Sequence, residues 1–221
     1  MSLSYPVILP PRQAMTPSLV AQIDAIRQAA CASSAPFFIH TLGGPGCGKS
    51  SLMTALRDFF AEKNPVFVAM DKLMEGMPEY QAGLKIDPAK AFVSCELPAR
   101  IACYALLKDL IAHRANIIFE HSGANDAHPA LLQYAKQAGY RIQLLHLQVS
   151  ADVAKARIIE RNAQGGRFTP PHYVDERNLI IAGLLPQYVQ IADNYHVLEN
   201  STNSADPVEA LRMQLRSGLR V

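Results

Sequence analysis

One stretch decides the fold of this chain: Gly43-Gly44-Pro45-Gly46-Cys47-Gly48-Lys49-Ser50, which fits the pattern G-x-x-x-x-G-K-[ST]. Glycines in such a stretch let backbone N–H groups turn inward around phosphate oxygens, and a following helix presents its N-terminus to the same anion. An apolar strand is predicted just before the stretch, over residues 37–40, and a helix just after it, from Lys49 to about Glu62. The stretch is therefore predicted to be a nucleotide-binding loop, because strand, loop and helix follow in the required order.

The chemistry of this loop predicts its ligands. A lysine at the position of Lys49 reaches the β- and γ-phosphates, and a hydroxyl at the position of Ser50 ligates Mg²⁺. We therefore expect the loop to bind ATP and Mg²⁺, with Ser50 as the metal-binding residue. The residues expected to bind the nucleotide are Gly43, Gly44, Pro45, Gly46, Cys47, Gly48, Lys49, Ser50 and Ser51.

Outward from the loop, strands and helices alternate. Further strands are predicted over residues 66–70, 116–119, 142–149 and 197–198. Helices are predicted over 17–30, 97–113, 129–138, 151–162, part of 171–192 and 207–216, and residues 72–88 are expected to be irregular. Apolar strands without alternation, separated by helices, indicate a parallel sheet that is covered on both faces. We predict an α/β fold of the P-loop kinase kind, with about five parallel strands and helices on both faces. It should form a single domain over residues 1–221, with residues 1–35 as an N-terminal arm and helix.

Composition excludes several classes of protein. Of the 221 residues, 49% are hydrophobic and 18% are charged, which is ordinary for a chain that buries a core and rules out disorder over most of its length. A formal net charge of +2 is too small to indicate nonspecific binding to nucleic acid or to an anionic membrane. The chain carries no signal-peptide pattern, no apolar run long enough to span a membrane and no C-x-x-C pair. A cytoplasmic protein with reduced thiols is expected.

Two carboxylates, Asp71 and Glu120, are predicted to follow the ends of apolar strands. The carboxyl ends of parallel strands open onto the ligand crevice in sheets of this kind. Each side chain is therefore a candidate general base, metal partner or acceptor-binding group. The alternative for each is a helix cap or a turn residue.

Basic residues gather in a later segment. Between residues 155 and 167, Lys155, Arg157, Arg161 and Arg167 stand against Glu160 alone. Such a cluster is either a solvated basic face or a lid that closes over ATP and stabilises charge on the transferred phosphoryl group. We favour an arginine-bearing lid over residues 161–170, because two glycines immediately before Arg167 can absorb large backbone changes.

Several classes of nucleotide-binding protein do not fit. The chain has no N-K-x-D guanine signature, and motor and transport ATPases are usually longer. Five segments in a fixed order, GGPGCGKSSL, MDKLMEGMPEY, NIIFEHSG, IIERN and RFTP, instead resemble the zeta toxin family, over about residues 37–199. Members of that family are similar to small P-loop kinases, and characterised ones phosphorylate UDP-N-acetylglucosamine on its sugar.

The resemblance implies roles for seven positions. Lys49 and Ser50 match the nucleotide loop, Asp71 the base for the acceptor hydroxyl, Glu120 and Ser122 the residues that hold the acceptor, and Arg161 and Arg167 the arginines that clamp the γ-phosphate. The implied catalytic residues are thus Lys49, Asp71, Arg161 and Arg167. An antitoxin protein as a partner is implied by the family alone.

Part of the family pattern is missing. Ala69 and Met77 stand where the family often has an aspartate and a histidine, and Tyr104 is in register with a second acceptor-binding glutamate. We therefore expect an ATP-dependent kinase that phosphorylates a hydroxyl of a small molecule, such as a nucleotide sugar like UDP-N-acetylglucosamine. The alternatives are another small-molecule or nucleotide kinase, of the antibiotic phosphotransferase kind, and a partner-regulated ATP-binding switch.

Overall fold

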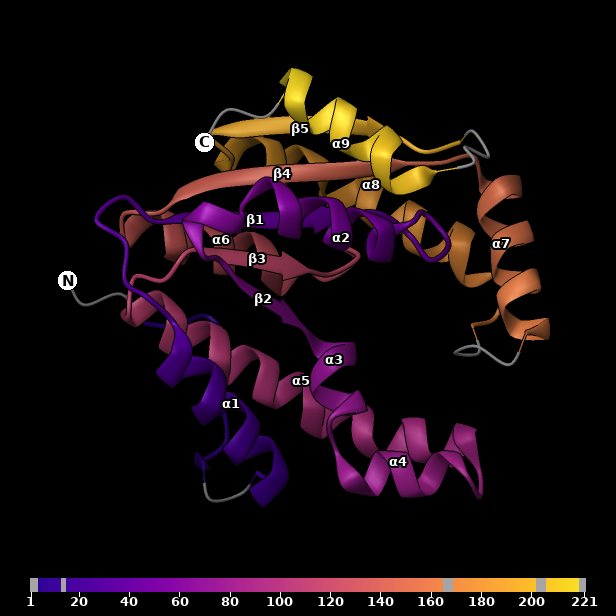
Figure 1. Cartoon of the computed structure of the whole chain (residues 1–221), viewed down its shortest axis with the longest axis horizontal. Coiled ribbons are helices and arrows are strands. Elements are labelled where there is room, and N and C mark those ends of the chain that lie inside the picture. Colours follow the sequence, from indigo (N-terminus) through magenta and orange to yellow (C-terminus); the bar gives the residue numbers. More distant parts are fainter. Residues whose placement is uncertain (1–3, 13–14, 165–168, 202–205, 219–221) are drawn as a thin grey trace.

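A five-stranded parallel sheet forms the centre of the molecule (Figure 1). The computed structural model describes residues 4–12, 15–164, 169–201 and 206–218. The strands lie in the order β2-β3-β1-β4-β5. Their bounds are β1 Phe37–Leu42, β2 Val66–Ala69, β3 Ile117–Glu120, β4 Arg141–Gln148 and β5 Asn194–Glu199. The predicted fold class is confirmed.

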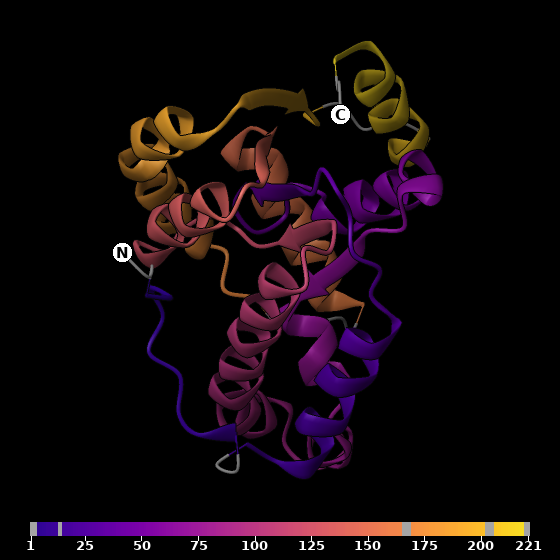
Figure 2. The same ribbon diagram turned by 90° about the vertical axis from the view of Figure 1, so that its left-hand side faces the viewer.

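Helices cover both faces of this sheet. Their bounds are α1 Pro17–Ala29, α2 Lys49–Phe59, α3 Met70–Glu75, α4 Pro78–Leu84, α5 Pro88–Ala112, α6 Ala127–Gln137, α7 Ala151–Ala163, α8 Tyr173–Ile191 and α9 Pro207–Gly218, with a short 3₁₀ turn, η2, at Ala61–Lys63. Figure 2 shows α2 and α9 on one side of the sheet and α6 and α8 on the other. Two separate apolar clusters fill the spaces between these helices and the strands.

The central strand β1 explains why both faces must be covered. Its six side chains are all buried. Because successive side chains of a strand point to opposite faces, Phe38 and Leu42 enter the cluster on the α5 and α6 side, whereas Phe37 and Ile39 enter the one on the α2 and α9 side. An apolar run without alternation is thus the pattern of a strand buried on both faces.

The segment after β2 differs from our prediction. The strand ends at Ala69, so Asp71 does not follow a strand directly but lies in the first turn of α3, and of the strand's side chains only Val68 is fully buried. Residues 72–88, expected to be irregular, form most of α3 and all of α4. The residues that suggested a break are the helix ends: Gly76 is the C-cap of α3 and Pro78 is at the start of α4, where proline is favoured.

Helix α5 is longer than predicted. It begins at Pro88 rather than near residue 97, and Pro98 lies inside it. A proline in a helix removes one hydrogen bond to the carbonyl four residues earlier. That carbonyl belongs to Ser94, which is exposed, so water can satisfy it and the helix continues.

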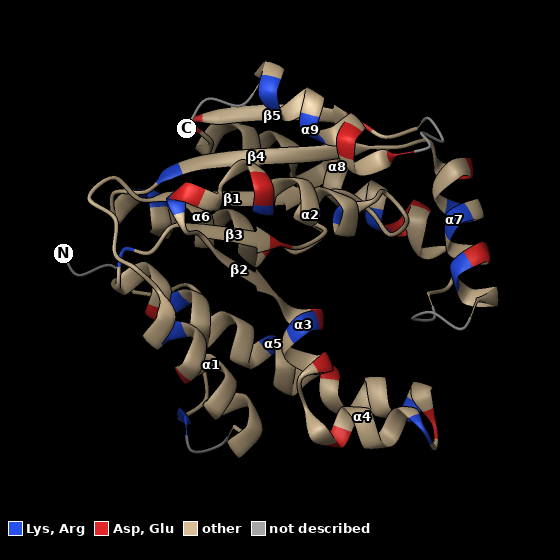
Figure 3. Ribbon diagram, in the orientation of Figure 1, with Lys and Arg blue, Asp and Glu red and all other residues tan. Residues whose placement is uncertain are grey.

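The carboxyl ends of all five strands meet at one edge of the sheet. Figure 1 shows α3 and α4 extending from this edge on one side and α7 on the other. The strands themselves carry charges only at their ends, as the tan ribbons of Figure 3 show. Within the described residues, no helix has the length and apolar character needed to cross a membrane.

Candidate active site

The loop between β1 and α2 depends on its glycines. Gly46 and Gly48 have φ angles of 77° and 98°, in the left-handed region that favours glycine. A Cβ at Gly46 would also lie 2.5 Å from the backbone oxygen of Ala154 in α7. The loop therefore packs so closely against α7 that a side chain at this position would displace one of the two.

Lys49 begins α2 and folds back over the loop. Its Nζ donates hydrogen bonds to the carbonyl oxygens of Gly43 at 2.9 Å and Gly44 at 3.0 Å. The ammonium group is thus held above the concave side of the loop, where a bound phosphate would compete for it. Ser50 follows at the exposed start of the same helix, where its hydroxyl is available to a cation.

Two contacts from distant parts of the chain fix the loop. The Gly43 N–H donates to the Ser122 carbonyl oxygen at 2.9 Å, which joins the loop to the end of β3. The Asn200 side chain, which is 5% exposed, donates from Nδ2 to the Cys47 carbonyl oxygen at 2.8 Å. Asn200 was not predicted as part of the site. Its place immediately after β5, at the carboxyl edge of the sheet, was the available signal.

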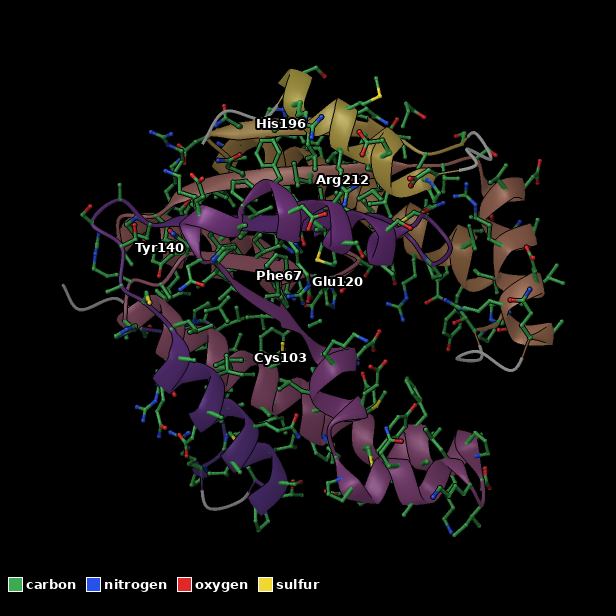
Figure 4. All side chains as sticks on the ribbon, viewed as in Figure 1. Phe67, Cys103, Glu120, Tyr140, His196 and Arg212 are labelled. Atoms are coloured by element: carbon green, nitrogen blue, oxygen red, sulfur yellow. The ribbon has the colours of Figure 1, made fainter. Side chains whose placement is uncertain are left out.

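The predicted acceptor-binding residues gather beside the loop. Strands β2, β3 and β1 are neighbours, and Ala69 of β2 is directly opposite Glu120 of β3. Asp71 follows two residues after Ala69, and Ser122 two residues after Glu120. The sheet therefore brings Asp71, Glu120 and Ser122 to one side of the phosphate loop, although the direct neighbour of the loop is Ser122. Figure 4 labels Glu120 at this edge.

Burial dominates the electrostatics of Glu120. It raises the pKa of this carboxyl group, and the nearby Glu75 raises it further, whereas the positive charges of Lys49, Lys72 and Arg57 oppose the shift. A desolvated carboxylate is a stronger hydrogen-bond acceptor than one in water. Lys72 and Arg57 were not predicted as part of the site, because they lie on α3 and α2 and reach Glu120 only through the fold.

Tyr104, which stands where the family has a glutamate, takes part in a buried polar chain. Its hydroxyl is 2.8 Å from Nε2 of His128 and accepts a hydrogen bond from Nδ2 of Asn125 at 2.9 Å. Nδ1 of His128 is in turn 3.0 Å from Nε2 of His40. His40 and His128 are completely buried, and burial lowers the pKa of both. The position therefore carries a neutral group in place of a negative charge.

The arginines of the predicted lid are placed only in part. Arg161, near the end of α7, donates from a terminal nitrogen to the Thr169 hydroxyl at 2.7 Å, and its burial lowers its pKa. Asn162 donates to the Thr169 carbonyl oxygen at 2.9 Å and accepts from the Thr169 N–H at 3.1 Å. These bonds tie the end of α7 to the chain that returns toward α8. Residues 165–168, which include Arg167, lie outside the described residues.

A cavity of about 470 Å³ lies on the other side of the loop. The loop contributes Gly44 and Cys47 to its wall, and the remainder comes from the ends of β4 and β5 and from one face of α8. Cavities of this size accommodate small molecules. The phosphate loop thus lies between the predicted acceptor-binding residues on one side and this cavity on the other.

Comparison with known proteins finds one matching family and several similar folds. A model of the zeta toxin family matches residues 22–194. A structure from the PezAT chromosomal toxin-antitoxin system of Streptococcus pneumoniae aligns with a TM-score of 0.68 at 17% identity, covering 90% of this chain and 91% of that one. A putative kinase from Chloroflexus aurantiacus aligns with a TM-score of 0.55 at 16% identity, covering 85% of this chain and 100% of that one.

A third structure contains a nucleotide. The AvrRxo1-ORF1:-ORF2 complex with ATP aligns with a TM-score of 0.62 at 14% identity, and the match covers 83% of this chain and 62% of that one. At these identities the likeness shows the fold alone. A search of curated proteins finds no significant match.

Proposed function

Since this chain belongs to the zeta toxin family and is an ATP-dependent phosphotransferase, we propose that it transfers the γ-phosphate of ATP to a hydroxyl of a nucleotide sugar, with UDP-N-acetylglucosamine as the first acceptor to test. The observation that supports this reaction best is the meeting of three strand ends at the phosphate loop. Ser122 bonds the loop directly, and Glu120 lies two residues before it. An acceptor held by these residues would lie next to the triphosphate.

We propose that Lys49 moves from the loop carbonyls to the β- and γ-phosphates when ATP binds. The glycine-lined loop and the start of α2 would hold the same phosphates through backbone N–H groups. The nucleoside would extend into the cavity beside Gly44. Mg²⁺, held by the Ser50 hydroxyl, would supply charge neutralisation between the phosphates.

On the acceptor side, Glu120 and Ser122 would orient the reacting hydroxyl. Asp71, in the first turn of α3, would take the hydroxyl proton as the oxygen attacks the γ-phosphorus. Arg161 and Arg167 would stabilise charge on the transferring phosphoryl group. The role of Arg167 rests on the family resemblance.

The test is product formation. The protein is incubated with Mg²⁺-ATP and a panel of UDP-sugars and common hydroxyl metabolites, and mass spectrometry looks for a product heavier by one phosphoryl group. We expect such a product with wild-type protein and almost none with Lys49→Ala, which removes the cation from the triphosphate. Equal turnover by Lys49→Ala would contradict the assignment of the loop.

A second acceptor class is favoured by a specific observation. Because Tyr104 binds His128 and Asn125, the pocket lacks a carboxylate that the family uses to hold its acceptor. Another small molecule or a nucleotide is therefore the alternative acceptor, and the same panel distinguishes the two.

An antitoxin partner is a separate proposal. It is supported by family membership and by the structural neighbour from a toxin-antitoxin system. Pull-down of a neighbouring gene product after co-expression tests it, and a partner that inhibits kinase turnover is the expected result.

A further inference from the structure

Three polar residues stand in a row at the carboxyl end of β3. The proposed function uses Glu120 and Ser122 and gives no role to His121 between them. All three lie at the edge of the sheet where ligands bind in parallel folds.

The tautomer of His121 follows from its hydrogen bonding. The Gly123 N–H donates to its Nδ1 at 3.0 Å, so Nδ1 is the acceptor and the proton of the neutral ring is on Nε2. Nε2 forms no hydrogen bond to a described residue. His121 itself is half-buried, so part of the residue remains exposed at this edge of the sheet.

The imidazole is held in place on several sides. Its ring stacks on Phe119, with centroids 5.7 Å apart, and its centroid lies 4.2 Å from that of His128. Thr41 holds the backbone of His121: its Oγ1 donates to the His121 carbonyl oxygen at 2.9 Å and accepts from the His121 N–H at 3.1 Å. The direction of the Nε2–H bond is therefore fixed before any ligand binds, which reduces the entropy cost of using it.

The surroundings of His121 decide what this N–H can bind. Burial lowers the pKa of His121 well below its ordinary value, and the positive charges of Lys49, Arg100 and Arg177 lower it further. The ring is therefore neutral near pH 7 and offers one donor in a positive environment. The matching group is an oxygen without a proton of its own, such as a carbonyl or phosphate oxygen.

We infer that His121 is an acceptor-binding residue whose Nε2–H donates a hydrogen bond to a carbonyl or phosphate oxygen of the acceptor, beside the hydroxyl that Glu120 and Ser122 hold. The inference rests on the proposed function and deepens it. It requires an acceptor that carries such an oxygen close to the hydroxyl that is phosphorylated.

Two substitutions test the roles of the two ring nitrogens of His121 separately. His121→Asn keeps an oxygen near the position of Nδ1 for the Gly123 N–H but places nothing at Nε2. His121→Gln reaches the position of Nε2 with an amide N–H. We expect Asn to raise KM for the phosphorylated acceptor about tenfold or more with a smaller effect on kcat, because a ground-state contact is lost, and Gln to restore most of the affinity. His113→Asn, at the exposed C-cap of α5, is the matched control.

The outcomes are distinguishable. If wild-type protein phosphorylates no member of the panel, the kinase proposal fails and this inference fails with it. If the wild type is active and His121→Asn keeps the wild-type KM, or if KM for ATP rises by the same factor, the inference alone is overturned.

Chemical labelling tests the accessible nitrogen without turnover. Diethyl pyrocarbonate acylates neutral, solvent-accessible imidazole nitrogens. Peptide mass spectrometry of the treated wild-type protein should show label on His121 and none on the buried His40 and His128. The acceptor identified by the screen should slow the labelling of His121. Absence of label on His121 would overturn the inference.

Discussion

Glu120 illustrates a conflict between stability and binding at a single side chain. Burial raises its pKa despite the positive charges of Lys49, Lys72 and Arg57, so the folded protein holds the carboxylate at a cost. A group whose pKa is raised in the folded state binds protons more tightly there than in the unfolded chain. The free energy of unfolding therefore falls as pH rises through the range between the unfolded and the folded pKa.

We predict that Glu120→Gln stabilises the protein while it weakens acceptor binding. The amide has nearly the same shape and carries no charge to desolvate, so Tm should rise at pH 8, by about 2–4 °C for each kcal/mol recovered. The gain in Tm over the wild type should become smaller as the pH approaches 5. KM for the acceptor should increase. Thermal melts at the two pH values measure the effect. A lower Tm at pH 8 would mean that attraction to the three cations outweighs burial.

Asp71 is the candidate base, and its substitution tests the proposed chemistry directly. Asp71→Asn keeps the shape of the side chain in the first turn of α3 but cannot accept a proton. Loss of a general base typically lowers the rate about 10²–10⁴-fold. We expect kcat to fall in this range with KM for ATP little changed. A near-normal kcat would make Asp71 a helix-end residue and leave Glu120 as the candidate base.

The shape of the phosphate loop depends on contacts with residues outside the loop. Its glycines permit the turn, but Asn200 after β5 and Ser122 after β3 hold it, through bonds to Cys47 and Gly43. A Cβ at Gly48 would lie 2.2 Å from Nδ2 of Asn200, so these two residues approach as closely as their atoms allow. The loop is therefore in direct contact with the residue that follows the last strand.

We predict that Asn200→Ala weakens ATP binding and destabilises the fold. The substitution leaves the Cys47 carbonyl oxygen without its partner in a buried place, which costs about 1–3 kcal/mol. Calorimetry with ATP and thermal melts measure the two effects. Gln214→Ala is the control, because Gln214 makes two hydrogen bonds to the adjacent Glu199 and contacts no loop residue through them. Equal losses of ATP affinity in both variants would contradict a specific role for Asn200.

Across the whole molecule, the polar chain on one face of the sheet links helices to the strands that carry the site. His40 on β1, His128 on α6 and Tyr104 on α5 bond one another, and Tyr5 of the N-terminal arm donates to the Tyr104 carbonyl oxygen at 2.8 Å. Together with His121, this places three neutral imidazoles between the sheet and its covering helices. No group of three or more His, Cys, Asp or Glu side chains in the described parts of the chain is arranged to hold a metal ion.

We predict that these imidazoles make the folded protein less stable in mild acid. Burial lowers the pKa of His40 to about 3 and brings those of His121 and His128 well below 6.5. The unfolded chain therefore binds more protons than the folded one once the pH falls below about 6.5, and each histidine then costs about 1.4 kcal/mol per pH unit. For His40 this loss ends near pH 3.

Urea denaturation at pH 7.5, 6.5 and 5.5 measures this dependence. We expect the free energy of unfolding to change little between the first two values and to drop by several kcal/mol at the third, because up to three groups contribute. A free energy of unfolding that is equal at pH 7.5 and 5.5 would show that these imidazoles titrate in the folded state with the same pKa values as in the unfolded chain. NMR titration of the imidazole resonances would confirm which of them remain neutral.

The elements that could be predicted are those specified by local patterns. An apolar run at 37–40, a glycine-rich turn and a helix that begins at Lys49 can each be predicted from a few residues. Strand burial, φ angles and helix starts depend on neighbours in the chain. The candidate residues Lys49, Asp71 and Glu120 could be named for the same reason, since each stands at or close to the end of such an element. Ser122 was named from the family resemblance alone. The short helices α3 and α4 were missed because their glycines and prolines look like breaks when they are in fact helix ends.

Only the tertiary structure determines which strand and helix ends lie next to one another. The strand order β2-β3-β1-β4-β5 places Glu120 beside the loop, and it pairs His40 with His128 across 88 positions and Asn200 with Cys47 across 153. No local pattern encodes such pairs, because their partners are chosen by how the helices pack over both faces of the sheet. For the same reason the neutral hydrogen-bond partners of Tyr104, and the Nε2–H of His121 that bonds no described residue, became visible only in the folded chain. There burial and neighbouring charges fix the protonation of each group.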